Sequence, residues 1–230
     1  MTNKNQFSKY AKEYKNHNII QQIVAKSLIR ELETKSKRIL ELGCGSGQVF
    51  KYINWNIDFY KAIDSSYEMC KLHPKADNIQ VKCFDFDTEE FINEIKNDKY
   101  DIVLSSSALQ WSKDLKKIIK VLSTITNEIN AVLFTSNTFK TIHEITNTKS
   151  PILDENTIKE AFSSYFECEF ETILYKLEFD SKKELFTYIK KSGVSPNASL
   201  PYQNAKKLYK EYTLNYLEFE VIFVKTISKL

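Results

Sequence analysis

Short apolar runs alternate with amphipathic stretches along the first 137 residues of this chain. An apolar run of about four to eight residues bounded by turn residues is typical of a buried strand, whereas apolar residues spaced three and four apart indicate a helix. Strands that alternate with helices across short loops predict a parallel sheet with helices on both faces. Strands are expected at 38–43, 57–64, 79–84, 100–105 and 129–136, and helices at 18–34, 48–54, 66–72, 88–96 and 113–124.

The regular alternation stops after residue 150. Asp154 has the chemistry of a helix N-cap, and Ser181–Glu184 has the S-x-x-E pattern of a capping box. Two late strands placed around helices predict an antiparallel hairpin added to the edge of the sheet. The expected elements are helices at 154–165, 181–193 and 206–217 and strands at 167–179 and 219–224.

Composition narrows the class of protein without identifying it. A chain of 230 residues with 42% hydrophobic and 27% charged residues is ordinary for one globular domain. The net charge of +3 is too small to indicate a nucleic-acid partner. The four cysteines lack CxxC spacing and the three histidines are scattered, so no metal site is expected. No apolar run approaches the length of a membrane span, and the N-terminus lacks a signal-peptide core, so a cytoplasmic protein is expected.

Three of the four glycines lie within five residues, at Gly43, Gly45 and Gly47. They follow the first expected strand in the sequence E-L-G-C-G-S-G, where the alternatives are a ligand-binding loop and a purely structural turn. Glycine is used where the backbone needs a positive φ or where a ligand touches the main chain. The strand-to-helix corner is also where α/β proteins bind ligands, which favours the ligand-binding loop.

Glu41, immediately before the loop, indicates which ligand fits. The spacing G-x-G-x-G differs from the dinucleotide pattern, and no Lys-Ser/Thr pair follows, so a Walker loop is excluded. A carboxylate in the same pocket repels a pyrophosphate and attracts an amine. S-adenosylmethionine carries an amino group and a sulfonium but no phosphate, so it is the expected cofactor.

Two further acids end the next two strands. Asp64 lies where nucleotide-binding α/β proteins place a carboxylate against ribose hydroxyls, although it also fits a simple strand-end cap. Asp85 is expected to accept the adenine amino group and Phe86 to face the ring. The alternatives are a turn residue for Asp85 and a core position for Phe86. Because the strands are parallel and adjacent, all three acids are expected at one edge of the sheet.

With these residues in place, the chain resembles the class I S-adenosylmethionine-dependent methyltransferases over residues 37–137. The resemblance implies a Rossmann-like α/β fold with a mostly parallel seven-stranded sheet, N-terminal lid helices and a small helical insertion on the substrate side. One departure is 127–130, where many relatives have a Gly-Gly turn, but Asn tolerates the left-handed conformation. The implied cofactor-binding residues are Glu41, Gly43, Cys44, Gly45, Gly47, Asp64, Ser65, Asp85, Phe86 and Ser105.

A narrower resemblance is to the biotin-synthesis family that methylates the malonyl group on acyl carrier protein. Residues 105–115 are similar to its S-N-x-A-x-Q-W segment, with Ser106 in place of the usual Asn. Residues 7–21 resemble its N-terminal segment, which closes over cofactor and substrate, and Tyr14 takes the position of its substrate-side Tyr. Residues 141–145 and 185–193 match two later family segments. Tyr14, Trp111 and His143 are thereby the candidate catalytic residues.

The expected reaction needs no general base, since a free carboxylate is already ionised at neutral pH and can attack the sulfonium methyl directly. The substrate's negative charge favours a nearby cation or hydroxyl, for which His143, Lys140 and Tyr14 are candidates. Tyr14 also fits an ordinary packing aromatic, and Trp111 fits an apolar plug over the sheet edge. The preferred hypothesis is a malonyl-[acyl-carrier protein] O-methyltransferase that leaves S-adenosylhomocysteine as product.

Two rival functions remain at this stage: methylation of another small molecule, and non-catalytic binding of S-adenosylmethionine. A nucleic-acid methyltransferase is disfavoured because the Asn-Pro-Pro-aromatic motif is absent. Lysines in the last third of the chain suit an acidic carrier protein, or simply a solvated surface. The expected organisation is one monomeric domain over 1–230, divided into a lid (1–36), a cofactor core (37–137) and a substrate side (138–230).

Overall fold

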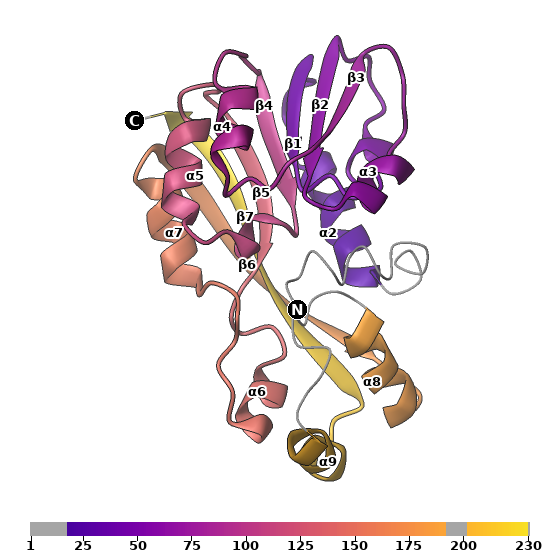
Figure 1. The fold of residues 1–230 in the computed structure, drawn as a ribbon. Helices are drawn as coiled ribbons and strands as arrows, with labels where there is room; N and C mark the ends of the chain where they lie inside the picture. Colours follow the sequence, from indigo (N-terminus) through magenta and orange to yellow (C-terminus); the bar gives the residue numbers. More distant parts are fainter. Residues whose placement is uncertain (1–17, 192–201, 230) are drawn as a thin grey trace.

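A single seven-stranded sheet runs through the computed structural model, which describes residues 18–191 and 202–229 (Figure 1). The strand order is β3-β2-β1-β4-β5-β7-β6. Strands β1 to β5 are parallel, whereas β7 is antiparallel to both β5 and β6. The predicted parallel sheet with an antiparallel hairpin at its edge is confirmed. The strands are β1 (Arg38–Leu42), β2 (Phe59–Asp64), β3 (Ile79–Cys83), β4 (Ile102–Ser106), β5 (Ile129–Phe134), β6 (Phe166–Glu178) and β7 (Tyr216–Lys229).

Helices cover both faces of the sheet (Figure 1). Side chains at their N-termini fix where several of them begin. Ser66, Thr88, Asp114 and Asp154 each accept a hydrogen bond from the backbone N–H three residues later, which satisfies one of the free donors of a first turn. The predicted cap at Asp154 is confirmed. The helices are α2 (Ile19–Arg30), α3 (Tyr67–Leu72), α4 (Glu89–Ile95), α5 (Leu115–Leu122), α6 (Lys140–Thr146), α7 (Glu155–Ser163), α8 (Lys182–Lys191) and α9 (Tyr202–Glu211).

The helix expected at 48–54 is wrong, because only a 3-10 turn, η2 (Phe50–Tyr52), follows the glycine loop. Its hydrogen bonds join residues three apart, and Ile53 returns to an extended conformation. The ring of Phe50 lies 5.1 Å from that of Tyr60 and 5.6 Å from that of His73, measured between centroids. These long-range aromatic contacts hold the tight turn, and the local sequence pattern does not contain them.

The boundaries near the C-terminus also differ from the prediction. The last helix, α9, ends at Glu211 instead of residue 217, and β7 begins at Tyr216 instead of residue 219. β7 pairs with β6 along the whole of that strand, up to the Glu178–Tyr216 pair, so the pairing extends β7 at both ends. The short helix α6 was not predicted.

Strand β7 joins two hydrophobic cores because its side chains alternate between the two faces of the sheet. Ile222 and Val224 pack with residues of α4, α5 and α7. Phe219 and Val221 pack in a second core with residues of α2, α6, α8 and α9. Figure 1 shows the β6–β7 hairpin extending beyond the other strands, with α6, α8 and α9 around its far end. The hairpin therefore holds these helices to the rest of the sheet.

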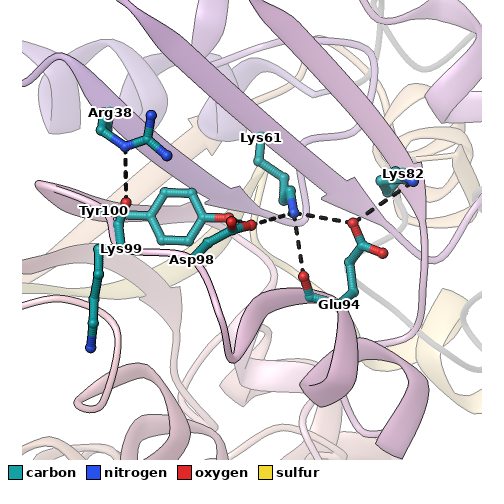
Figure 2. Close-up of polar contacts among 7 residues, drawn as sticks. All are labelled: Arg38, Lys61, Lys82, Glu94, Asp98, Lys99 and Tyr100. Atoms are coloured by element: carbon teal, nitrogen blue, oxygen red, sulfur yellow. Dashed lines mark hydrogen bonds and ion pairs between the residues drawn. The ribbon is translucent and has the colours of Figure 1, made fainter.

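A buried cation ties α4 to the face of the sheet (Figure 2). Lys61 of β2 has a side chain only 4% exposed, and its ammonium lies 3.1 Å from Glu94 and 2.7 Å from Asp98. The Tyr100 hydroxyl donates to the same Asp98 carboxylate at 3.0 Å. These contacts lower the pKa of Asp98, with the Lys61 hydrogen bond as the largest cause. The Lys61 ammonium is therefore hydrogen-bonded to acids at the end of α4 although its side chain is buried.

We expect Lys61→Met to destabilise the protein by about 1–3 kcal/mol at pH 7, because it removes a charged hydrogen-bond donor from two carboxylates. Asp98 has a lowered pKa in the folded state, so its contribution is present above the unfolded pKa and is lost as the pH falls through the folded value. Urea unfolding at pH 7 and at pH 3 should therefore show a difference from wild type that shrinks in acid.

The matched control is Lys117→Met, which breaks the exposed Lys117–Glu89 pair of 3.1 Å. Its expected effect is below about 1 kcal/mol at either pH. An equal loss in the two variants would contradict a structural role for the Lys61 cluster.

Candidate functional site

A cleft lies at the carboxyl ends of β1, β2 and β4. This is the edge of an open α/β sheet at which ligands bind. Its walls are formed by Asn18, Gln21, Glu41, Gly43, Cys44, Gly45, Ser46, Gln48, Val49, Asp64, Ser65, Met69, Phe86, Ser106, Ser107, Ala108 and Trp111. The structure therefore brings most of the predicted cofactor residues to one place.

The glycine loop has a backbone that only glycine adopts easily. Gly43, Gly45 and Gly47 have φ values of 73°, 52° and 86°. A Cβ at Gly43 would lie 2.0 Å from the Ala108 Cβ, and one at Gly47 would lie 2.5 Å from the Pro74 ring. A Cβ at Gly45 would meet nothing within 4 Å. The outer two glycines thus serve close packing, and the middle one leaves open space at the cleft.

Asp64 fixes this loop against the end of β2. Its Oδ2 accepts the Gly45 N–H at 2.9 Å and its Oδ1 accepts the Ser66 N–H at 2.7 Å. A carboxylate oxygen has two lone pairs and can accept more than one hydrogen bond. Asp64 and Ser65 both line the cleft. The predicted contact of Asp64 with ribose hydroxyls stays a prediction, with a geometry that suits it.

Glu41 is an ionisable group with almost no access to water, since the residue is 1% exposed. The Tyr60 hydroxyl donates to its Oε2, and the His73 Nε2 lies 4.0 Å from the same oxygen. Burial raises the pKa of Glu41 to about 8, the Tyr60 hydrogen bond opposes that rise, and the Asp64 charge adds to it. The expected acid therefore does face the cleft, in a setting that strongly disfavours a free carboxylate.

The end of β4 supplies hydroxyl groups that sequence reasoning missed. Ser106 and Ser107 line the cleft, and their Oγ atoms are buried with no hydrogen-bond partner among the described residues. Ser107 also has a φ of 60°, which is uncommon outside glycine. By contrast, the predicted Ser105 lies in the sheet, where its hydroxyl donates to the Leu42 carbonyl at 2.9 Å. The period-2 alternation of a strand was the available signal, because it turns Ser105 and Ser106 to opposite faces.

Asp85 and Phe86 are placed differently by the structure. Phe86 lines the cleft, but Asp85 is not among the residues that do. The Asp85 Oδ1 accepts the Asp87 N–H at 3.0 Å, as in a turn. The adenine contact of Asp85 stays a prediction, which the present geometry does not support.

The three candidate catalytic residues have separate outcomes. Trp111, in the 3-10 turn η3 (Leu109–Trp111), lines the cleft. His143 is not among the residues that line it, and its Nδ1 lies 3.0 Å from the Thr148 hydroxyl. Tyr14 lies outside the described residues. Among the three, only Trp111 has a described position at the cleft.

The residues of the cleft suit a nucleoside joined to an amino acid. The buried acid Glu41 suits an amino group, the carboxylate of Asp64 suits hydroxyl donors, and Phe86 and Met69 offer apolar surface. Within 18–191 and 202–229, no three His, Cys, Asp or Glu side chains are grouped as metal ligands. The helices of the same ranges include none that is long and apolar enough to cross a membrane.

Comparison with known proteins agrees with this geometry. Residues 40–129 match a family described as a methyltransferase domain. The malonyl-[acyl-carrier protein] O-methyltransferase of Bacillus anthracis is 25% identical over 234 residues, which cover 89% of this chain and 84% of that protein. The protein of the same name from Calditerrivibrio nitroreducens is 27% identical over 233 residues, which cover 96% of this chain and 89% of that protein.

Solved structures show the same fold at low sequence identity. YcgJ from Bacillus subtilis has a TM-score of 0.63 at 12% identity, over 90% of this chain and 99% of that one. A Haloferax volcanii methyltransferase in complex with the activator Trm112 has a TM-score of 0.62 at 15% identity, over 98% and 97% of the two chains. The class I methyltransferase fold predicted from the sequence is therefore confirmed.

Two glycine substitutions distinguish the role of Gly43 in packing from the role of Gly45 in leaving space for a ligand. We expect Gly43→Ala to destabilise the protein by more than about 2 kcal/mol, since it adds both backbone strain and a clash with Ala108. Gly45→Ala adds strain alone, about 1 kcal/mol, but it places a methyl group in the open space of the cleft. Thermal unfolding and S-adenosylhomocysteine titration should show a larger stability loss for Gly43→Ala, and for Gly45→Ala an affinity loss beyond its small stability loss. Equal stability losses would refute the assignment of packing to Gly43.

Proposed function

We propose that this class I S-adenosylmethionine-dependent methyltransferase transfers a methyl group to the free carboxylate of a malonyl thioester held on acyl carrier protein. The methyltransferase domain match and the strand order establish the general class. The acceptor is our proposal, supported by relatives of that name that align along most of this chain. In this proposal the reaction is an early step of biotin synthesis, in which the ester hides one negative charge of the malonyl group.

The observation that carries the proposal is the chemistry of the cleft wall. Its only described acids are Glu41 and Asp64, both on the cofactor loop side, and no His, Lys or Tyr is among the described residues that line it. A hydroxyl or amine acceptor would more often need a general base to remove a proton. A carboxylate, with a pKa of about 4, is already the nucleophile at neutral pH. A cleft wall of this kind therefore favours an acceptor that is already ionised.

Positioning is then the main task of the protein. When bound, S-adenosylmethionine supplies a methyl group on a positively charged sulfur. Trp111 and Phe86 give the cleft apolar walls, and the buried hydroxyls of Ser106 and Ser107 are donors available to a ligand. Holding the carboxylate oxygen in line with the methyl group lowers the barrier without any proton transfer. Tyr14 and His143 keep their proposed substrate-side roles only as predictions.

A lysine-rich surface on α8 and α9 suits an acidic carrier protein. Lys182, Lys183, Lys206 and Lys210 are exposed, while Lys207 lies 4.0 Å from Glu211. The two helices are in contact through Phe186, whose ring centroid lies 5.8 Å from that of Tyr209. The lysines therefore belong to neighbouring helices at the end of the β6–β7 hairpin. Clustered charge of one sign raises the association rate of an oppositely charged partner.

The direct test is to incubate the protein with S-adenosylmethionine and malonyl-acyl carrier protein and to search for a methyl ester by mass spectrometry. We expect a mass increase of one methylene unit on the carrier and one S-adenosylhomocysteine per ester. Growth of a biotin-requiring host that lacks this step gives an independent readout. Transfer to another small carboxylate but not to the malonyl carrier would refute the acceptor. Cofactor binding without any turnover would indicate a non-catalytic binding protein.

The carrier-protein surface makes its own prediction. Lys183→Glu combined with Lys206→Glu should raise KM for malonyl-acyl carrier protein by about tenfold at low salt, because charge reversal repels the partner. The kcat value and the methylation of malonyl-coenzyme A, which lacks the carrier, should change little. The control is Lys116→Glu combined with Lys120→Glu on α5, which are equally exposed. An unchanged KM in the first variant would refute this docking surface.

A further inference from the structure

The wall behind the cofactor loop contains a polar cluster that the reaction as described so far does not use. Glu41, Tyr60 and His73 are 1%, 0% and 2% exposed. Glu41 pairs with Ala62 in the β1–β2 register, so Tyr60, two residues earlier on the same strand, shares its face of the sheet. The ring centroids of Tyr60 and His73 lie 6.2 Å apart, and Phe50 packs against both rings. The three polar side chains are therefore held in one dry compartment.

Of the groups that face Glu41, only the Tyr60 hydroxyl stabilises its charged form. Tyr60 donates one hydrogen bond to Oε2. His73 pairs its Nδ1 with the Pro74 carbonyl at 2.9 Å, which assigns the ring proton to Nδ1 and leaves a lone pair on Nε2, 4.0 Å from Oε2. Asp64 contributes a negative charge and Cys44 a buried thiol with a raised pKa. Among the described residues no cation approaches Glu41, so a carboxylate there has a single neutral donor.

We propose that the dry compartment closed by Phe50, Tyr60 and His73 keeps Glu41 protonated in the free protein, so that Glu41 releases a proton when the cationic amino group of the cofactor enters the cleft. Tyr60 is a positioning residue, because its hydroxyl sets how readily Glu41 ionises. The O–H bond of the Glu41 carboxyl breaks, the proton passes to solvent, and an ammonium–carboxylate pair takes its place. No electron transfer is involved. The inference rests on the assignment of the cleft to S-adenosylmethionine and not on the identity of the methyl acceptor.

The arrangement gives the site a reason to prefer a charged ligand. A neutral acid costs far less to bury than an ionised one, so the free protein avoids an unpaired buried charge. A ligand that brings its own positive charge restores the carboxylate and gains a charged hydrogen bond in a water-poor site. An analogue without the amino group gains neither. Tyr60 sets how readily Glu41 ionises, because its hydroxyl stabilises the carboxylate, whereas the His73 lone pair does not.

Calorimetry with S-adenosylhomocysteine, which carries the same amino group, measures the released proton directly. Binding enthalpies at pH 6.5 in two buffers of different ionisation enthalpy should give close to one proton released per ligand. Burial raises the pKa of Glu41 to about 8, so below that pH each binding event must release the Glu41 proton. Kd should therefore fall close to tenfold for each unit by which the pH rises between about 5.5 and 7. The probe 5′-methylthioadenosine, which lacks the amino acid part and its cationic α-amino group, should release no proton and show a Kd that does not change with pH.

Variants distinguish the effect of proton release on ligand binding from the effect of losing a packed side chain. Glu41→Gln should bind S-adenosylhomocysteine more weakly at pH 7, with no proton release and no pH dependence. Tyr60→Phe should weaken binding at pH 7 by about tenfold or more, because Glu41 loses the donor that favours its ionisation. The pH range over which Kd changes should move to higher pH. The matched control Tyr100→Phe removes a buried hydroxyl that donates to Asp98, away from the cleft, and should leave the pH profile unchanged.

A 13C titration of the Glu41 side chain in the free protein decides the inference without any ligand. A titration near pH 8 supports it, and one below pH 5 overturns it. Binding of S-adenosylhomocysteine with no net proton release would also overturn it. If the ligand failed to bind at any pH, the assignment of the cleft would be wrong, and the titration would still report the charge state of Glu41.

Discussion

The carboxylate of Asp64 joins the two turns on which the cleft depends. It accepts one N–H from the glycine loop after β1 and another from the turn after β2. The loop is held a second time by the Ile63 carbonyl, which accepts the N–H groups of Gly43 and Cys44 at 2.7 and 3.1 Å. With both ends fixed, the loop turns sharply enough to pack against Ala108 and still leave space at Gly45. Loss of this carboxylate would release both walls of the cleft together.

The electrostatics of the cleft follow from the same geometry. Bringing β1 and β2 together places Asp64 near Glu41, and the cover of Tyr60, His73 and Phe50 keeps water away from Glu41. Two acids that lie close together do not both ionise easily in a dry site. A positively charged ligand resolves this conflict. The affinity for a sulfonium amino acid and the charge state of Glu41 are therefore two aspects of one arrangement.

The hairpin of β6 and β7 connects the cofactor half of the molecule to the helices beyond it. Its residues alternate between two cores, one under α4, α5 and α7 and the other under α2, α6, α8 and α9. Asn18, the N-cap of helix α2, and Gln21 within the helix line the cleft. Ile20, Val24 and Leu28 of the same helix belong to the second core.

The sequence alone determined the parallel sheet with an antiparallel hairpin at its edge, the glycine loop and the acids at the ends of the first two strands. These features are local: apolar runs, glycines and strand-end carboxylates lie within a few residues of one another, and parallel strands must bring their carboxyl ends to one edge. The cover over Glu41 was decided only by the tertiary structure, because Tyr60 and His73 reach it from other elements. The tertiary structure also decided three other features: the short η2 turn, the position of His143 outside the cleft lining, and the presence of Ser106 instead of Ser105 in that lining. Each of these features depends on contacts with side chains that are distant in the sequence, and the pattern of hydrophobic and polar residues along the chain does not reveal such contacts.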